Sequence, residues 1–329
     1  MNLLETYAAV RQGAGVIDRS TRGRIVVRGA DRKTFLHALL TNDIALLAPG
    51  TGCYAAFLTP QGRMIADMQV FELGEVMLLD VAREVKDLLL ERFDQVIFSE
   101  DVQLGDVSDA WGCVGVYGPQ AVDVAGRALA GDLSQYGPFQ NSRAEFQGEL
   151  VVVARSDGFG LPGILLFTAA ERIPALTETL LASGAVPFST DVAEVLRVEA
   201  GDPAFLVDMT DDTIPLEAGI ETRAISYLKG CYPGQEVIIR IRDRGHGKVA
   251  RKLVGLTIAG NDVPAAGSRI VDGDKDVGHV TSAVFSPSLA IPIALGYVHR
   301  DFTAPGSTVT IVGGDRRVPG TVTELPFVR

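Results

Sequence analysis

The sequence changes character after Gly245. From there on it consists of short β-branched runs punctuated by glycine and proline, with scarcely any helical pattern. The runs are KVARKLVGLTIAG, SRIVDGDKDVGHVTSAVFS, IALGYVHRDF, STVTIVGG and RRVPGTVTEL. Such runs are typical of antiparallel strands joined by tight turns. We therefore predict a domain boundary near residue 246 and a small antiparallel barrel or sandwich over residues 246–329.

Upstream of this boundary, strand-like and helix-like segments alternate. RIVVRG is a predicted strand ending at Gly29, and DRKTFLHALL is a predicted helix with Asp31 at its N-cap. CYAAFLTPQGRMIADMQVFELGEVMLLDVA contains two or three strands, and REVKDLLLERFDQVIF is an amphipathic helix. WGCVGVYG and ELVVVARSDGFGLPGILLF are further strands, separated by a helix after Pro119 and a surface loop. ERIPALTETLLASG is helical, and DVAEVLRVEAG is a helix ending at Gly201. The mixture indicates an α+β class rather than regular βαβ units.

Composition excludes several classes of protein. The length of 329 residues favours two or three domains, and a hydrophobic content of 47% is that of an ordinary globular protein. The longest apolar runs are much shorter than the roughly 20 residues of a membrane span, and the first residues show no export signal. A net charge of -11 argues against stable nucleic-acid binding. We therefore expect no membrane or nucleic-acid partner.

The cysteines and histidines limit the chemistry further. Cys53, Cys113 and Cys231 are far apart and odd in number, so they cannot all form disulfides, and a reducing cytoplasm is expected. The sequence has no phosphate-binding loop, dinucleotide fingerprint, zinc-protease motif or nucleophile elbow. The 4 histidines share no ligand spacing, so no metal site is predicted.

The stretch KGCYPGQEVIIRIRDRG, residues 229–245, is the most informative part of the chain. Cys231 is either a small buried hydrophobe, the commonest state of a free cysteine, or a reactive thiol. Periodicity leaves open whether QEVIIRIRDR is a strand or a helix. In a helix, Cys231 would precede the N-terminus, where the backbone dipole and Lys229 would both favour the thiolate.

Charged residues around this stretch have two interpretations each. Glu199 and Glu217 are either solvated helix-end acids or carboxylates that accept paired hydrogen bonds from a 2-amino-4-oxo pteridine. A local basic cluster is either a solvated face or a site for an anionic ligand such as a glutamate tail. Its members are Lys229, Arg240, Arg242, Arg244, Lys248, Arg251 and Lys252.

LRVEAGDPAF, IPLEAGI and above all KGCYPGQEVIIR resemble the YgfZ family of folate-binding proteins, relatives of the glycine-cleavage T-protein. The likeness covers the whole chain, including DRSTRGRIVVRGADRKTFLHALLTNDIALLAPG and LTPQGRMIADMQVF. It implies three domains around a central cavity. Two are interleaved mixed α/β, ferredoxin-like domains, approximately residues 1–48 with 140–245 and residues 49–139, and the third is the barrel.

The resemblance also implies a ligand, tetrahydrofolate or a one-carbon derivative. Glu199 would contact the pterin, Arg240 and Arg251 the anionic tail, and the motif residues Tyr232 and Gln235 would belong to the same cofactor site. The YgfZ branch implies a monomeric protein that supports assembly or repair of iron-sulfur proteins. Cys231, beside Lys229, would be its functional residue, as a nucleophile, a redox thiol or a transient cluster ligand.

The alternative function is that of a folate-dependent aminomethyl or methyl transferase or demethylase. The sequence departs at two places from the pattern of the transferase branch. The transferase branch has two adjacent acids where this chain has Ala66 and Asp67. It also has GYTGE where this chain has DGFGLPG, with Phe159 in place of tyrosine. Asp67 is therefore the one acid that the matched segments offer as a catalytic group. A scaffold that binds no folate is the third possibility.

Overall fold

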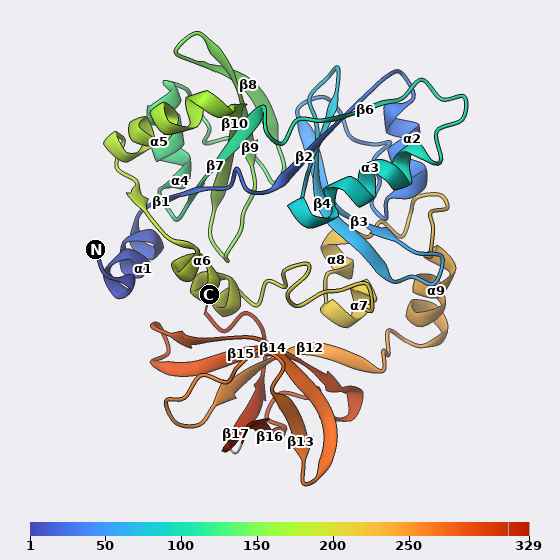
Figure 1. The fold of residues 1–329 in the computed structure, drawn as a ribbon, viewed down its shortest axis with the longest axis vertical. Coiled ribbons are helices and arrows are strands. Elements are labelled where there is room, and N and C mark those ends of the chain that lie inside the picture. Colours follow the sequence, from blue (N-terminus) through green and yellow to red (C-terminus); the bar gives the residue numbers. More distant parts are fainter. Residues whose placement is uncertain (315, 329) are drawn as a thin grey trace. The chain divides into compact units, whose positions relative to one another are not determined.

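The computed structural model describes residues 1–314 and 316–328, which form two compact units. Unit 1 comprises residues 1–60, 65–189 and 223–233, and unit 2 comprises residues 61–64, 190–222 and 234–329. Unit 1 contains two mixed α/β sheet layers, and unit 2 contains a closed barrel (Figure 1). The predicted fold class, mixed α/β with a C-terminal barrel, is confirmed.

The first sheet of unit 1, sheet A, has six strands in the order β11-β1-β7-β10-β9-β8. They are β1 (Gly15–Asp18), β7 (Trp111–Tyr117), β8 (Asn141–Phe146), β9 (Glu149–Arg155), β10 (Gly163–Ala169) and β11 (Val186–Pro187). Helices α4 (Ala121–Leu129) and α5 (Ile173–Ala182), the latter after the turn η2 (Ala170–Arg172), bury apolar faces in one core with these strands. Strand β8 lies where we predicted a surface loop. Its four central residues alternate between half-buried and exposed positions, so its sequence resembles that of a loop.

The second sheet, sheet B, has five strands in the order β3-β4-β5-β2-β6. They are β2 (Gly23–Arg28), β3 (Thr51–Leu58), β4 (Met64–Glu72), β5 (Met77–Val81) and β6 (Gln103–Asp106). Helix α2 (Arg32–Leu39) and helix α3 (Lys86–Asp94), which follows the turn η1 (Arg83–Val85), pack together. The ring of Phe93 lies 6.1 Å from Phe35 and 5.3 Å from Phe57 between ring centroids.

The two sheets are interleaved in sequence. Strand β2 pairs with β5 and β6, so the chain enters sheet B at residue 23. Strand β7 pairs with β1, so the chain has returned to sheet A by residue 111. These limits differ from the predicted division into residues 1–48 with 140–245 and residues 49–139. The difference arises because strand pairing between distant segments decides membership of a sheet.

The N-terminal caps of helices α1 (Leu3–Gln12) and α2 differ from what the sequence predicts. Asp31 is at the N-cap position of α2, as predicted, but its side chain makes no capping bond to the helix and instead accepts the Asp101 N–H at 2.8 Å. Helix α1 was not predicted, although Asn2 and Glu5 form a reciprocal capping box. Just before Asp31, Gly29 has φ +103°, and a Cβ there would lie 1.9 Å from the Asp101 carbonyl oxygen. Glycine is therefore required where β2 ends.

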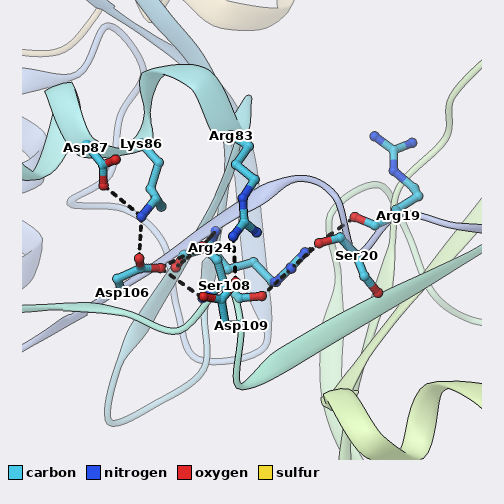
Figure 2. Close-up of polar contacts among 9 residues, drawn as sticks. All are labelled: Arg19, Ser20, Arg24, Arg83, Lys86, Asp87, Asp106, Ser108 and Asp109. Carbon is cyan, nitrogen blue, oxygen red and sulfur yellow. Dashed lines mark hydrogen bonds and ion pairs between the residues drawn. The ribbon is translucent and has the colours of Figure 1, made fainter.

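A buried arginine, Arg24, forms hydrogen bonds to both segments in which the chain passes from one sheet to the other (Figure 2). Arg24 is fully buried, and its Nη2 donates to the carbonyl oxygens of Ser20 at 2.7 Å and Ser108 at 2.8 Å. Its backbone N–H donates to the Ser108 hydroxyl at 2.9 Å. Ser20 lies between β1 and β2, and Ser108 lies between β6 and β7. One side chain therefore satisfies backbone carbonyls of both crossings.

In unit 2, the barrel order is β12-β15-β14-β13-β16-β17. The strands are β12 (Arg251–Ile258), β13 (Arg269–Asp272), β14 (Lys275–Ser286), β15 (Ile291–His299), β16 (Thr308–Gly313) and β17 (Arg316–Thr323), with the turn η4 (Arg300–Phe302) after β15. Strand β12 begins shortly after the boundary predicted near residue 246. Helix α6 (Thr190–Ala200) stops at Gly201, as predicted, where φ is +68°. Val198 of α6 packs against Leu253, Ile293 and Leu295.

The remaining helices are short. They are α7 (Pro215–Ala218), α8 (Glu221–Ala224) and α9 (Gln235–Ile239), which continues into a π-helical turn, η3 (Arg240–Arg244). QEVIIRIRDR is therefore helical, which decides between the two conformations that its sequence left open. Over residues 1–314 and 316–328, no helix is both long enough and apolar enough to cross a membrane.

Candidate functional site

Asp67 lies on the half-exposed face of strand β4. Along this strand Ala66, Met68 and Val70 are buried, whereas Asp67 and Gln69 are half-buried on the opposite face. The alternation places Asp67 on the polar face of the strand. Its Oδ2 accepts a hydrogen bond from the Tyr54 hydroxyl at 2.7 Å. A carboxylate with this exposure and an aromatic hydroxyl partner has the chemistry of a general acid or base.

Sequence reasoning missed Tyr54, which binds Asp67, and the residues that contact Tyr54. Tyr54 comes from β3, Arg223 begins the last segment of unit 1, and the Arg223 guanidinium carbon lies 4.9 Å from the centroid of the Tyr54 ring. Asn42 donates to the backbone carbonyl oxygens of both residues. No local pattern marks this group, because its members meet only through strand pairing and through the return of residues 223–233 to unit 1.

Lys229 anchors the KGCYPGQE segment. The side chain is buried, and its Nζ donates to the carbonyl oxygens of Leu40, at 2.5 Å, and His37, where α2 ends. Nζ also lies 5.0 Å from the ring centroid of buried Tyr232. Burial lowers the pKa of Lys229 to about 8. Lysine at a helix C-terminus satisfies carbonyls that have no partner within the helix.

The other predicted residues of this segment lie at the start of α9. Gly234, with φ +83°, is the N-cap residue, and Gln235 is the first helical residue. Cys231 therefore precedes a helix, as one of the two predicted conformations required. Arg240 is exposed, and its Nη2 forms an ion pair with Glu236 at 2.6 Å. The role of Gln235 in cofactor binding stays a prediction.

The three cysteines have different environments. Cys231 is exposed, Cys53 is half-buried and Cys113 is buried. Burial raises the pKa of the Cys53 thiol, and likewise of the Cys113 thiol, to about 12. The thiolate is the reacting form of cysteine, so a raised pKa slows reaction with electrophiles.

We expect a disulfide reagent such as dithionitrobenzoate at pH 8 to modify one thiol of the native protein rapidly, and the others only on unfolding. Exposure of Cys231 and burial of Cys113 are the physical reasons. Release of thionitrobenzoate, followed by absorbance, gives the measurement, with Cys231→Ser and Cys113→Ser as a matched pair. Loss of the rapid phase in Cys113→Ser instead of Cys231→Ser would contradict this assignment.

Glu199, the predicted pterin contact, is in unit 2 and has an exposed fraction of 0%. Its Oε1 accepts a hydrogen bond from the Ser286 hydroxyl of β14 at 2.5 Å. Its backbone carbonyl oxygen accepts bonds from Phe327 and Val328. The residue is thus part of the packing of α6 on the barrel, and the pterin contact stays a prediction.

Arg251 lines a pocket of about 460 Å³ in unit 2. Its Nε donates to Glu217 at 3.2 Å, its Nη2 donates to the Asp212 carbonyl oxygen at 3.0 Å, and its guanidinium carbon lies 4.9 Å from the Tyr297 ring centroid. His279, beside Tyr297, also lines the pocket. Glu217 offsets the charge of Arg251, as Glu236 offsets that of Arg240. The predicted contacts of both arginines with an anionic tail stay predictions.

Metal-binding side chains do not gather in the described part of the chain. Residues 1–314 and 316–328 contain no group of three or more His, Cys, Asp or Glu side chains that could hold a metal ion.

Comparisons with known proteins cover almost the whole chain. The GCVT N-terminal domain matches residues 2–227, and the glycine cleavage T-protein C-terminal barrel domain matches residues 251–329. The aminomethyltransferase of Rubrobacter xylanophilus is 32% identical over 98% of this chain and 85% of that protein. The aminomethyltransferase of Geobacillus kaustophilus is 31% identical over 100% of this chain and 91% of that protein.

A solved structure shows the same fold. The glycine cleavage system aminomethyltransferase T of Bartonella henselae has a TM-score of 0.90 with 24% identity, over 99% of this chain and 90% of that chain. Tetrahydrofolate, the cofactor predicted from the sequence, is the one used by aminomethyltransferases of this kind. With both of its domains matched and near-complete relatives above 30% identity, the chain belongs to the glycine cleavage T-protein family.

Proposed function

We propose that the protein binds tetrahydrofolate, or a one-carbon derivative, and transfers a one-carbon unit between that cofactor and an aminomethyl donor. Full-length similarity to aminomethyltransferases supports this reaction class. The observation that carries the proposal is Asp67, the acid of the matched segment, half-exposed and held by Tyr54 at 2.7 Å. The sequence favoured an iron-sulfur role and kept transfer as the alternative. The relatives support the alternative better.

The side chains around Asp67 fit the chemistry of such a cofactor. Tetrahydrofolate supplies two amine nitrogens, N5 and N10, between which a one-carbon unit is carried. The carboxylate of Asp67 can take a proton from an amine and return it. The Tyr54 hydroxyl fixes one carboxylate oxygen, so Asp67 has a defined orientation before a ligand binds. The aromatic ring of Tyr54 adds an apolar surface beside the carboxylate.

Calorimetry under anaerobic conditions tests the binding part. We expect one tetrahydrofolate per wild-type chain. If Glu199 contacts the pterin, Glu199→Gln should weaken binding by about 1.5–3 kcal/mol, the usual contribution of a hydrogen bond to a charged group. Glutamine retains an oxygen that can accept the Ser286 hydroxyl, so the substitution leaves the packing of α6 largely unchanged. An absence of folate binding by the folded wild-type protein would refute the proposal.

A second candidate, the iron-sulfur accessory role of the YgfZ branch, is favoured by the placement of Cys231. This thiol is exposed between two buried side chains, Lys229 and Tyr232, in an anchored segment. Because iron-sulfur clusters take about four protein ligands, a partner protein would supply the others. Reconstitution of a purified iron-sulfur enzyme should be faster with wild type than with Cys231→Ser. Equal rates would exclude this role for the thiol.

A further inference from the structure

We infer that Arg223 and Asn42 are positioning residues for Asp67 and that both act through Tyr54. The inference rests on the proposed function and adds residues to it. Four residues form one connected group: Asn42 after α2, Tyr54 on β3, Asp67 on β4 and Arg223 in α8. All four belong to unit 1.

Asn42 fixes the backbone on both sides of the group. Its Nδ2 donates to the carbonyl oxygen of Tyr54 at 2.8 Å and to that of Arg223 at 3.1 Å. Its Oδ1 accepts the N–H of Asp43 at 2.8 Å, so the side-chain amide has hydrogen-bond partners at both ends. One side chain therefore sets the spacing between strand β3 and the segment that begins at Arg223.

Thr41 reinforces this connection. Its buried hydroxyl donates to the Ala224 carbonyl oxygen at 2.7 Å and accepts the Ala56 N–H at 2.9 Å. Its own carbonyl oxygen accepts the Ser226 N–H at 3.0 Å. Thr41 thereby connects residues 223–226 to β3, because it bonds to Ala224 and Ser226 on one side and to Ala56 of β3 on the other. The position of Arg223 over Tyr54 follows from this backbone placement.

The exposed Arg223 side chain has a role in this arrangement beyond solvation. Its guanidinium carbon lies 4.9 Å from the Tyr54 ring centroid, within the range of cation–π attraction. The contact restricts the ring, and the ring carries the hydroxyl that donates to Asp67. A cation over a phenol also polarises it, which strengthens its O–H as a donor. Restricting Tyr54 therefore restricts the Asp67 carboxylate.

The same segment carries the first five residues of the KGCYPGQE motif, residues 229–233. Residues 223–233 are held to the rest of unit 1 at one end by Asn42 and Thr41 and at the other by Lys229. Substitutions at Arg223 remove its side-chain contact with Tyr54 and leave the backbone bonds to Asn42 and Thr41 in place.

Carbon-13 NMR of protein labelled at aspartate Cγ provides a test that needs no activity. The Asp67 signal is assigned by its absence in Asp67→Asn. We expect Tyr54→Phe to move this signal and Arg223→Gln to move it in the same direction by a smaller amount. Arg92→Gln, on an exposed arginine of α3, is the matched control and should leave the signal in place. An Asp67 signal unmoved by Arg223→Gln overturns the inference.

Transfer kinetics provide the second readout. Tyr54→Phe should lower kcat about 10- to 100-fold, as expected for loss of one hydrogen bond to a charged group. Arg223→Gln should lower kcat about 2- to 5-fold with KM nearly unchanged. The double variant should be no slower than Tyr54→Phe, because both residues act by one route. Additive losses would overturn that route.

The two readouts separate this inference from the proposed function. If wild type transfers no one-carbon unit, the proposed function fails, and the NMR comparison alone decides whether Arg223 positions Asp67. Thermal unfolding of each variant identifies a merely structural effect. A lowered melting temperature of Arg223→Gln without displacement of the Asp67 signal overturns the inference.

Discussion

Replacement of Asp67 by asparagine is expected to lower kcat for one-carbon transfer by about 10²- to 10⁴-fold, the usual contribution of a positioned general acid or base. Asparagine has the shape of aspartate and still accepts the Tyr54 hydrogen bond, so the geometry of β3 and β4 is retained. It cannot take up a proton at neutral pH. The measurement is methylenetetrahydrofolate formation from an aminomethyl donor under anaerobic conditions.

Asp87→Asn is the matched control for this result. Asp87 is exposed on α3, where it pairs with Lys86 at 2.7 Å, and the same chemical change there should leave kcat within a factor of two of wild type. Tetrahydrofolate binding by Asp67→Asn, measured by calorimetry, separates a loss of chemistry from a loss of the ligand. Wild-type kcat in Asp67→Asn would show that another group moves the proton.

Replacement of Asp208 by alanine is expected to lower the free energy of unfolding by about 3–5 kcal/mol, the cost of breaking a buried ion pair by removing one partner. Side-chain exposure is 0% for Asp208 and 9% for Arg197, and their closest atoms are 2.5 Å apart. Asp208 also accepts bonds from the hydroxyls of Thr281 and Ser282 and from the Ala204 N–H. Its removal leaves the charge of Arg197 and two barrel hydroxyls without this partner.

Arg197 offers its own control, because it has a second carboxylate partner. Glu194 binds the same guanidinium at 2.6 Å, but its side chain is 43% exposed. Glu194→Ala should therefore cost only about 0–1 kcal/mol. Urea unfolding followed by circular dichroism compares the two variants. Equal midpoints for Asp208→Ala and Glu194→Ala would show that burial does not decide the strength of this network.

Much of the secondary structure could be predicted because its signals are local. The β-branched runs after Gly245 became the barrel, and α6 stops at Gly201, where φ is positive. Strand β8 and helix α1 were missed. The residues of β8 alternate between half-buried and exposed positions and so resemble a surface loop, whereas the capping box of Asn2 and Glu5 was a usable signal.

The candidate site could be predicted only in part. Asp67 came from comparison of a short segment with a family. The residue is half-exposed on β4, and its catalytic role stays a prediction. The predicted effect of Lys229 on the Cys231 thiolate stays a prediction. The Lys229 Nζ donates to the carbonyl oxygens of His37 and Leu40, because a buried ammonium group needs acceptors. The pairing of Arg251 with Glu217 likewise joins residues far apart in the sequence.

The sequence by itself determined the T-protein family, the class of fold and the residue types available for chemistry, because these depend on local pattern and on segments matched along the whole chain. The YgfZ branch, inferred from KGCYPGQE, stays a prediction. Only the tertiary structure decided that β2 belongs to sheet B and that Asn42 joins Tyr54 to Arg223. The physical reason is range: propensities and caps act over a few residues, whereas strand register and buried polar contacts are chosen by the packing of the whole unit.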